Sequence, residues 1–137
     1  MSLKFLLTGG LGYIGSHTAL DILSQKKNKL CIIDNLYNSK IETKNRIDNF
    51  SNDYIFYNLS IQNKNKLQEV FKYFLPDIVI HFAGLKNTDE SIENPLLYYK
   101  ENILSTINLL EIMELFKCKN LVFSSSATVY GHNSNNV

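Results

Sequence analysis

The chain has 137 residues, about the length of one domain, and 45% of them are hydrophobic, which is enough for a core. Its formal net charge is +1, so no overall charge attracts it to nucleic acid or to an anionic membrane surface. No apolar run approaches the roughly 18 residues of a membrane span, and the run after Met1 is too short for a signal peptide. Cys31 and Cys118 fit no metal or redox spacing, and we expect buried free thiols in a cytoplasmic protein.

Short apolar runs alternate with helical patterns from the start of the chain. Residues 3–7 predict a buried strand that ends at a glycine cluster. Residues 14–26 have helical spacing, and we expect this helix to end near Asn28, because asparagine tolerates the left-handed conformation that helix ends often need. A second strand is predicted at 30–33 and a weak helix at 41–50.

The alternation continues through the rest of the chain. It predicts three strands and two helices, at 54–58, 64–75, 78–84, 96–117 and 121–124. Alternation over the whole length favours an α/β fold, a parallel sheet with helices on both faces and right-handed crossovers. We predict a Rossmann-type doubly wound sheet with strand order 3-2-1-4-5, in one domain spanning residues 1–137.

The longest helical pattern, residues 96–117, has an apolar stripe along one side. We expect the stripe to lie mostly in the core. Its members are Leu97, Ile103, Ile107, Leu110, Met113 and Leu115.

The segment LLTGGLGYIGSH places three glycines at three-residue spacing between the first strand and the first helix. Gly9 permits a sharp turn, Gly12 lets backbone approach a pyrophosphate, and Gly15 lets the helix pack closely on the strand. The free N–H groups and the dipole of the helix N-terminus favour an anion there. The pattern therefore indicates a dinucleotide site, and an ordinary glycine-rich turn is the alternative.

Asp34 ends the second predicted strand, about 20 residues after the third glycine, where dinucleotide-binding folds place a carboxylate. Such a carboxylate accepts hydrogen bonds from the adenosine ribose and repels a 2′-phosphate, which favours NAD over NADP. The alternative is that Asp34 only caps a turn.

Together these residues resemble the extended short-chain dehydrogenase/reductase family, which carries T-G-x-x-G-x-x-G at this loop. Further strings resemble the UDP-glucose 4-epimerases within it. These are DNLYNSK at 34–40, VIHFAGLK at 79–86, ENPLLYYKEN at 93–102 and FSSSATVYG at 123–131. The resemblance covers nearly the whole chain.

The resemblance implies a set of cofactor contacts. Grouped along the chain, they come from Gly9, Gly12, Tyr13, Ile14 and Gly15; from Asp34, Asn35, Asn38 and Ser39; from Ser60 and Ile61; and from Phe82, Ala83, Gly84, Lys86 and Asn102. The family usually has an aspartate at the position of Ser60, so the adenine contact there is weaker or water-mediated. The alternative to a cofactor contact for Lys86 is a solvated lysine in a loop. We expect His81 to be a packed core histidine. Ser126 is implied as the catalytic serine that hydrogen-bonds the reacting sugar hydroxyl.

The family implies an isomerase of galactose metabolism that interconverts UDP-hexoses at C4 through a 4-keto intermediate. The implied cofactor is NAD, and the implied substrate is a UDP-sugar. The implied assembly is a homodimer formed through the helix at 96–117. The family's base is the tyrosine of a Y-x-x-x-K pair, and no tyrosine here is followed four residues later by lysine. We therefore expect an N-terminal fragment that lacks the later strands and the C-terminal substrate domain and is inactive alone. The sequence does not distinguish plain, N-acetylated and uronic sugars.

Two other functions stay open. A nucleotide-sugar 4,6-dehydratase needs an acid–base pair, typically Asp-Glu, just after the serine of the fifth strand, where this chain has Ala127 and Thr128. A non-catalytic NAD-binding module is permitted by the missing Y-x-x-x-K pair. The intact SSSATVYG segment serves catalysis and favours the enzyme.

Overall fold

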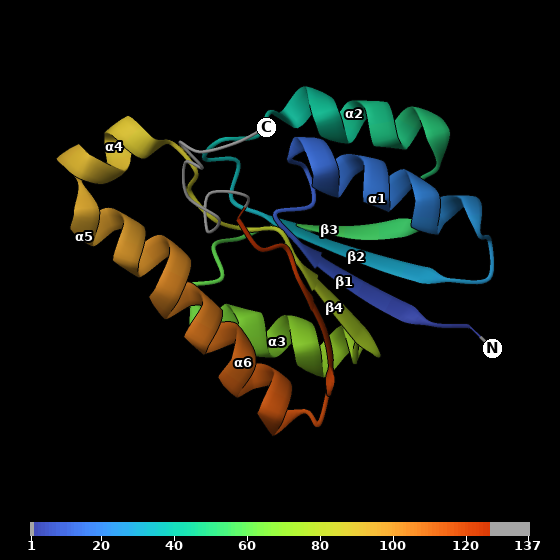
Figure 1. Ribbon diagram of the computed structural model, residues 1–137. Coiled ribbons are helices and arrows are strands. Elements are labelled where there is room, and N and C mark those ends of the chain that lie inside the picture. Colours follow the sequence, from blue (N-terminus) through green and yellow to red (C-terminus); the bar gives the residue numbers. More distant parts are fainter. Residues whose placement is uncertain (1, 127–137) are drawn as a thin grey trace, which may run out of the picture.

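The computed structural model describes residues 2–126, which form a five-stranded sheet between two layers of helices (Figure 1). The strands are β1 (Lys4–Thr8), β2 (Lys29–Asp34), β3 (Tyr54–Asn58), β4 (Ile78–His81) and β5 (Asn120–Phe123). They lie in the order β3-β2-β1-β4-β5, and every neighbouring pair is parallel. The predicted Rossmann-type order is confirmed.

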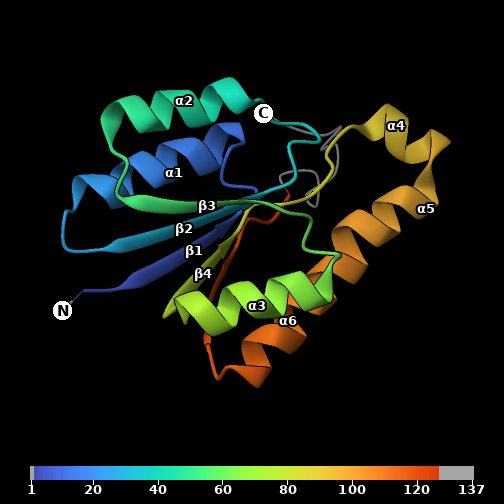
Figure 2. The same ribbon diagram turned by 180° about the vertical axis from the view of Figure 1, so that it is seen from behind.

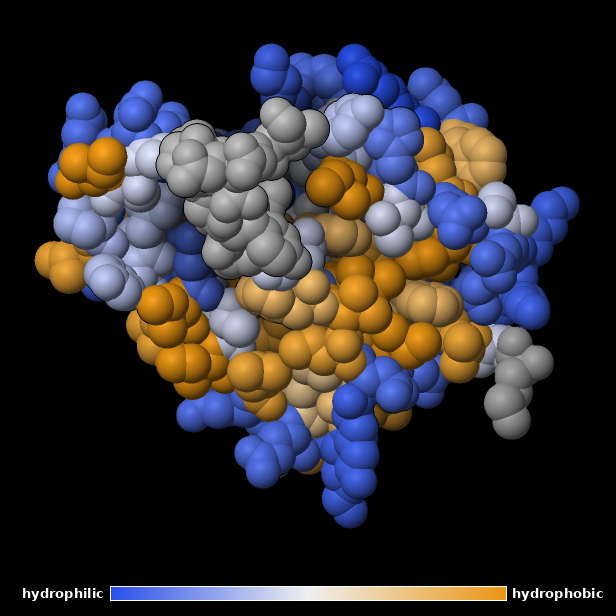
Figure 3. Space-filling view, in the orientation of Figure 1, coloured by the Kyte–Doolittle hydropathy of each residue, from blue (hydrophilic) through white to orange (hydrophobic). Residues whose placement is uncertain are grey.

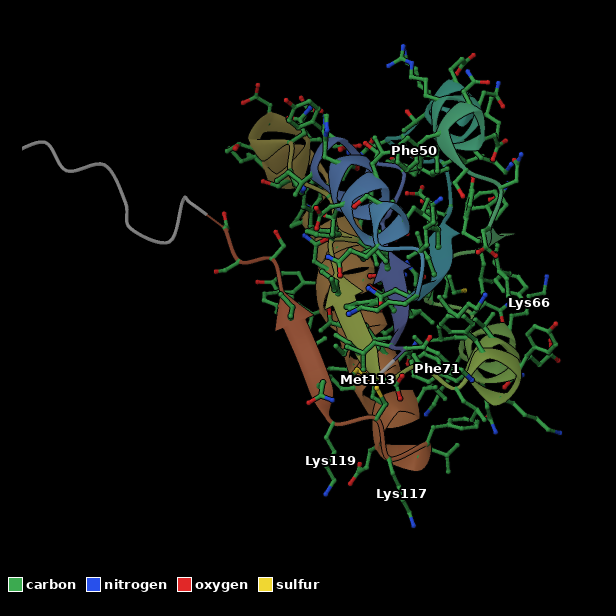
Figure 4. The ribbon with its side chains drawn as sticks, turned by 90° about the vertical axis from the view of Figure 1, so that its right-hand side faces the viewer. Phe50, Lys66, Phe71, Met113, Lys117 and Lys119 are labelled. Carbon is green, nitrogen blue, oxygen red and sulfur yellow. The ribbon has the colours of Figure 1, made fainter. Side chains whose placement is uncertain are left out.

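Helices α1 (Tyr13–Ser24) and α2 (Ile41–Phe50) cover one face of the sheet, and α3 (Lys64–Phe74) and α6 (Ser105–Leu115) cover the other (Figure 2). Each face has its own core, because successive side chains of a strand point to opposite sides. In β1, for example, Leu6 packs with α3 and α6, whereas Leu7 packs with α1. Figure 4 shows Phe71 of α3 and Met113 of α6 in the layer beside the sheet.

Polar side chains and backbone geometry set the helix ends. The Asn63 side chain caps α3 by accepting a hydrogen bond from the Lys66 N–H at 3.1 Å. Helix α3 ends at Phe74, and its C-cap residue Leu75 has a φ of 50°, just before Pro76. The expectation for Asn28 is wrong. Helix α1 ends at Ser24, and Asn28 is buried, with its side-chain oxygen 3.4 Å from the Leu3 N–H.

The crossover between β4 and β5 differs most from the prediction. The helix expected at 96–117 comprises α5 (Pro95–Tyr98), a π-helical segment η1 (Tyr99–Leu104) and α6, and it ends at Leu115. The short helix α4 (Thr88–Glu93) was not predicted. Its amphipathic pattern is too short to detect, but Asn87 caps it, and two acidic residues in its first turn suit the helix dipole. Strand β4 ends three residues earlier than expected, at His81.

The expectation that the apolar stripe lies in the core is wrong for most of its members. Ile103, Ile107, Leu110 and Leu115 are 44 to 59% exposed, and only Met113 is buried. The face that α6 buries is formed by Ser105, Leu109, Ile112 and Met113. A π-helical turn shifts the phase of the residues after it, which a uniform 3.6-residue period does not anticipate. Figure 3 shows an apolar area low on the face where β5 and α6 lie in Figure 1.

Within residues 2–126, no helix combines the length and the apolar character needed to cross a bilayer.

Candidate functional site

A cleft of about 480 Å³ lies at the carboxyl ends of β1, β2, β3 and β4. Strand order reverses between β1 and β4, and this switch point is where open α/β sheets bind ligands. Most residues proposed from the sequence meet on its walls. They are Gly9, Gly12, Tyr13, Ile14, Gly15, Asp34, Asn35, Asn38, Ser39, Ser60, Ile61, Phe82, Ala83, Gly84 and Lys86.

Gly9 and Gly15 are fixed by close packing. Gly9 has a φ of +68°, and a Cβ there would lie 2.6 Å from the Ala83 nitrogen and 2.8 Å from its Cα. A Cβ at Gly15 would lie 2.5 Å from the Gly9 carbonyl oxygen. No side chain fits at either position, so helix α1 begins directly against the end of β1. The predicted roles of these two glycines in turning and close packing are consistent with these distances.

The N-terminus of α1 faces the cleft. Gly12 is its N-cap residue, no side chain caps it, and Gly12 to Gly15 lie on the cleft wall. A Cβ at Gly12 would meet only the Gly9 oxygen, at 3.3 Å, so this side of the loop is open. The first N–H groups of a helix have no partner within it, and they carry the positive end of the helix dipole. An anionic group in the cleft would find hydrogen-bond donors here.

Asp34 is 7% exposed and lies at the end of β2. One carboxylate oxygen accepts from the Leu11 N–H at 2.9 Å, and the other accepts from the Leu36 N–H at 2.9 Å and the Ser39 hydroxyl at 2.6 Å. The capping interpretation is therefore correct in part, because Asp34 organises both its own turn and the glycine loop. An ionised carboxylate has about four acceptor positions, which leaves roughly one for a ligand.

The segment after β4 forms the opposite wall. The Asn102 side chain, from η1, accepts from the Leu85 N–H at 2.7 Å and donates to the Leu85 carbonyl at 3.0 Å. Asn102 therefore supports the wall from behind and is not itself on the cleft surface. Gly84 passes directly over it, because a Cβ at Gly84 would lie 3.2 Å from the Asn102 oxygen.

A pair of hydrogen bonds links the β2 side of the cleft to the α4 side. Tyr37 donates to one Glu90 oxygen at 3.2 Å, and Tyr98 of α5 donates to the other at 2.8 Å. The negative charge and hydrogen bond of Glu90 raise the pKa of Tyr37, and burial and the bond to Glu90 raise that of Tyr98. Both hydroxyls therefore stay protonated near neutral pH.

Six further cleft residues were missed by sequence reasoning. They are Ile33, Tyr37, Leu59, Leu85, Asn87 and Glu101. Tyr37, Leu85 and Asn87 lie inside or beside motifs that were recognised, so adjacency was the available signal. Glu101 also lies inside a recognised string, directly before Asn102, and it reaches the cleft from η1.

Ser126 is the last residue that the structure describes. It is exposed, lies three residues past β5 and is not among the residues on the cleft wall. Ala127, Thr128 and the rest of the SSSATVYG segment lie outside the described residues. Among residues 2–126, no group of three or more His, Cys, Asp or Glu side chains has the arrangement to hold a metal ion.

A parallel sheet in this order, with a glycine loop and a bare helix N-terminus at its switch point, defines a Rossmann-type domain. The family model described as GDP-mannose 4,6 dehydratase matches residues 6–137. The chain therefore belongs to the GDP-mannose 4,6 dehydratase family.

Individual relatives agree with the resemblance drawn from the sequence. The chain is 45% identical over 135 residues to UDP-glucose 4-epimerase 2 of Arabidopsis thaliana, covering 96% of the chain and 38% of that protein. The crystal structure of the Stenotrophomonas maltophila UDP-glucose 4-epimerase with bound NAD and formylated UDP-arabinopyranose superposes with a TM-score of 0.89 at 37% identity, covering 97% of the chain and 40% of that structure. The Bifidobacterium longum UDP-glucose 4-epimerase with NAD⁺ and UDP gives 0.88 at 37% identity, covering 93% and 38%.

The chain thus spans well under half the length of the relatives it matches.

Proposed function

We propose that residues 1–137 form a domain that binds NAD in the cleft between the glycine loop and the loop after β4. The observation that carries the proposal is the uncapped N-terminus of α1, which faces the cleft together with the carboxylate of Asp34. The Stenotrophomonas and Bifidobacterium relatives are described with bound NAD, which supports the same ligand here.

The cleft residues fit a dinucleotide from one end to the other. Gly12 presents no side chain at the α1 N-terminus, and a Cβ there would meet only the Gly9 oxygen at 3.3 Å, so a pyrophosphate can approach the helix end. The remaining acceptor position of Asp34 suits a ribose hydroxyl, and its charge disfavours a 2′-phosphate. Ser60 and Ile61 would flank the adenine, with Ser60 replacing the family's usual aspartate.

The nicotinamide end would then lie along residues 82–86, which Asn102 supports from behind. Lys86 is exposed on this wall, and its positive charge would lie near the bound phosphates or sugar. Glu101 is a negative group that also lines the cleft.

We extend the proposal to epimerisation at C4 of a UDP-hexose, as an isomerase of galactose metabolism. Bound NAD would supply the oxidant that removes a hydride from C4 and returns it to the opposite face. Ser126 would hydrogen-bond the reacting hydroxyl and orient it. The Y-x-x-x-K pair that the resemblance implies as proton acceptor is not found in these 137 residues.

The family description favours one alternative, a nucleotide-sugar 4,6-dehydratase. That reaction needs an acid and a base after the serine of the fifth strand, and Ala127 and Thr128 supply neither. A non-catalytic NAD-binding module remains the second alternative. The string FSSSATVYG argues against a non-catalytic module, because it contains Ser126 and the resemblance connects it with catalysis.

The proposal extends to assembly and compartment. The exposed apolar side chains of η1 and α6, among them Ile103, Ile107 and Leu110, suit a homodimer interface. Cys31 and Cys118 are buried free thiols, and burial raises the pKa of Cys31 to about 12, so both suit a reducing cytoplasm.

Calorimetric titration of the chain with NAD⁺ and with NADP⁺ tests the binding proposal. We expect NAD⁺ to bind more tightly, and absence of NAD⁺ binding or a preference for NADP⁺ would refute the proposed site. The activity is tested by a coupled assay with UDP-galactose on the chain and on any longer protein that contains it. Release of a 4-keto-6-deoxy sugar by the longer protein would identify the dehydratase instead.

A further inference from the structure

His81 lies at the end of β4 and makes two hydrogen bonds within the protein. It is 1% exposed. Its Nδ1 lies 2.5 Å from the Thr8 hydroxyl at the end of β1, and its Nε2 lies 2.9 Å from the Thr106 hydroxyl on α6. The side chain thus connects the centre of the sheet to a helix 25 residues away in sequence. The sequence-based expectation of a packed core histidine captured its burial but not these bonds.

The hydrogen-bond network fixes the direction of each bond. The Thr106 hydroxyl donates its single proton to the Asn102 carbonyl at 2.6 Å. Thr106 can therefore only accept from His81, so Nε2 of the ring carries a hydrogen. In the neutral ring Nδ1 then accepts from the Thr8 hydroxyl. Burial lowers the pKa of His81 to about 4, so the ring is neutral near pH 7, as this assignment requires.

The bonds continue from Thr106 to the wall of the cleft. Asn102, whose carbonyl Thr106 holds, binds both backbone polar groups of Leu85 with its side chain. Leu85 lies between Gly84 and Lys86, and all three lie on the cleft wall. Hydrogen bonds through His81, Thr106 and Asn102 therefore connect Thr8 to the backbone that forms this wall.

The helix at this point is not regular, which makes the position of Asn102 depend on the network. Asn102 lies within the π-helical segment η1, which separates α5 from α6. Threonine hydroxyls that bond the carbonyl four residues earlier often bend helices, and π-helical turns are rare and occur frequently at functional sites. Thr106 makes this bond to Asn102, so the orientation of the Thr106 side chain affects the helical turn from which the Asn102 side chain reaches Leu85.

We propose that His81 is a positioning residue for the nucleotide site: through Thr106 and Asn102 it holds the Leu85 backbone, and with it the cleft wall at residues 82–86. The proposal rests on the proposed NAD site for its effect on binding. The mechanical part, which is the position of Leu85, does not depend on the identity of the ligand.

The test compares Thr106→Val with Thr106→Ser in the 137-residue chain. Valine keeps the shape but removes both hydroxyl bonds, whereas serine keeps the hydroxyl. Ile112→Val, in the buried face of α6 and outside the network, is the control for general destabilisation. Two quantities are measured, the affinity for NAD⁺ by calorimetry and the hydrogen-exchange rate of the Leu85 amide by NMR.

For Thr106→Val, which loses both hydroxyl bonds, we expect about a tenfold loss of NAD⁺ affinity, comparable to the net contribution of a single hydrogen bond, and faster exchange of the Leu85 amide. Thr106→Ser should restore both, and Ile112→Val should change neither. A ring ¹⁵N spectrum of the wild-type chain should show a neutral His81 protonated at Nε2.

Equal losses in Thr106→Val and Ile112→Val, or a ring protonated at Nδ1, would overturn the positioning role. If the wild-type chain binds no NAD⁺, the proposed function fails, and the exchange measurement still decides the positioning role. In that case faster Leu85 exchange in Thr106→Val, rescued by serine, supports the network, and unchanged exchange overturns it.

Discussion

The two walls of the cleft are built by opposite means. The glycine wall, residues 9–15, is shaped by missing side chains, because a Cβ at Gly9 or Gly15 would overlap neighbouring backbone. The β4 wall, residues 82–86, is held by a side chain, since Asn102 binds both backbone groups of Leu85. One wall is therefore specified by local sequence and the other by contacts from a distant helix.

The two walls also touch. The nearest atoms to a Cβ at Gly9 belong to Phe82 and Ala83 of the β4 wall. A displacement of either wall is thus transmitted to the other through backbone contact, without any intervening side chain. Substitutions in the glycine wall should act through steric overlap of the added side chain with neighbouring backbone. Substitutions behind the β4 wall should act by removing hydrogen bonds that hold this wall in place. The two kinds of substitution should therefore differ in their effects on stability and on ligand binding.

The largest expected effect is that of Gly9→Ala. Its φ of +68° costs ~1–2 kcal/mol for an L-residue, and overlap with Ala83 adds ~1–3 kcal/mol, so we expect a loss of about 3 kcal/mol in the free energy of unfolding. Urea denaturation followed by circular dichroism measures it. Gly12→Ala is the matched control, because its Cβ would meet only one oxygen at 3.3 Å and should cost below about 1 kcal/mol. Similar losses in both variants would contradict the overlap argument.

Behind the β4 wall, His81 should make the free energy of unfolding depend on pH. The unfolded chain protonates His81 near pH 6.5, whereas the folded chain does so only near pH 4. Between these values the unfolded state binds more protons, so stability falls as the pH falls, by up to about 3 kcal/mol in total, and levels off below about pH 4.

Urea titrations of the wild-type chain and of His81→Gln at pH 7 and pH 4.5 check this contribution. Glutamine can still donate to Thr106 but does not titrate, so this part of the pH dependence should disappear. Carboxylates such as Asp48, whose bonds to Lys44 and Tyr54 lower its pKa, titrate in both proteins and cancel in the comparison. Equal pH dependence in the two proteins would show that His81 is not the group responsible.

Asp34 lies on the cleft at the end of β2 and is bonded to the glycine wall through the Leu11 N–H, so it tests the surface beside that wall. We expect Asp34→Asn to weaken NAD⁺ binding by about 1.5–3 kcal/mol and to reduce the preference over NADP⁺. The amide removes the charge, and its NH2 group would face a backbone N–H, of Leu11 or of Leu36, instead of accepting from it. Calorimetry with both nucleotides measures the change. Ser39→Ala removes one bond to Asp34 but keeps the charge, so it should keep the preference. A variant Asp34→Asn that still discriminates as the wild type does would exclude Asp34 as the selecting group.

The difference between the walls explains what the sequence could predict. Strand order, the glycine loop and Asp34 followed from short patterns, because each depends on a strand, a turn and a helix that are adjacent in the chain. Apart from the local bond from Thr106 to Asn102, the hydrogen bonds between Thr8 and Leu85 join residues 17 to 73 positions apart, and no spacing rule indicates such bonds. The burial of the stripe on 96–117 failed for a related reason, since η1 interrupts the helix with a turn that helical periodicity does not encode. The roles assigned to the individual site residues, Ser126 among them, stay predictions.

The smallest effect is expected at the side-chain bridge outside both walls, where Tyr37 after β2 meets Glu90 of α4. Tyr37 bonds Glu90 at 3.2 Å and is 53% exposed, so Tyr37→Phe should change the free energy of unfolding by less than about 0.5 kcal/mol. Tyr98 bonds the same carboxylate at 2.8 Å from a half-buried position, so Tyr98→Phe should cost about 1 kcal/mol. Urea denaturation of the two single variants and the double variant measures both costs and their coupling. Because the two hydroxyls share one carboxylate, losing Tyr37 leaves Glu90 still paired with Tyr98, and the double variant should lose more than the sum of the singles. A cost for Tyr37→Phe as large as that for Tyr98→Phe would mean that the bridge across the cleft, and not the local α4–α5 contact, is what fixes Glu90.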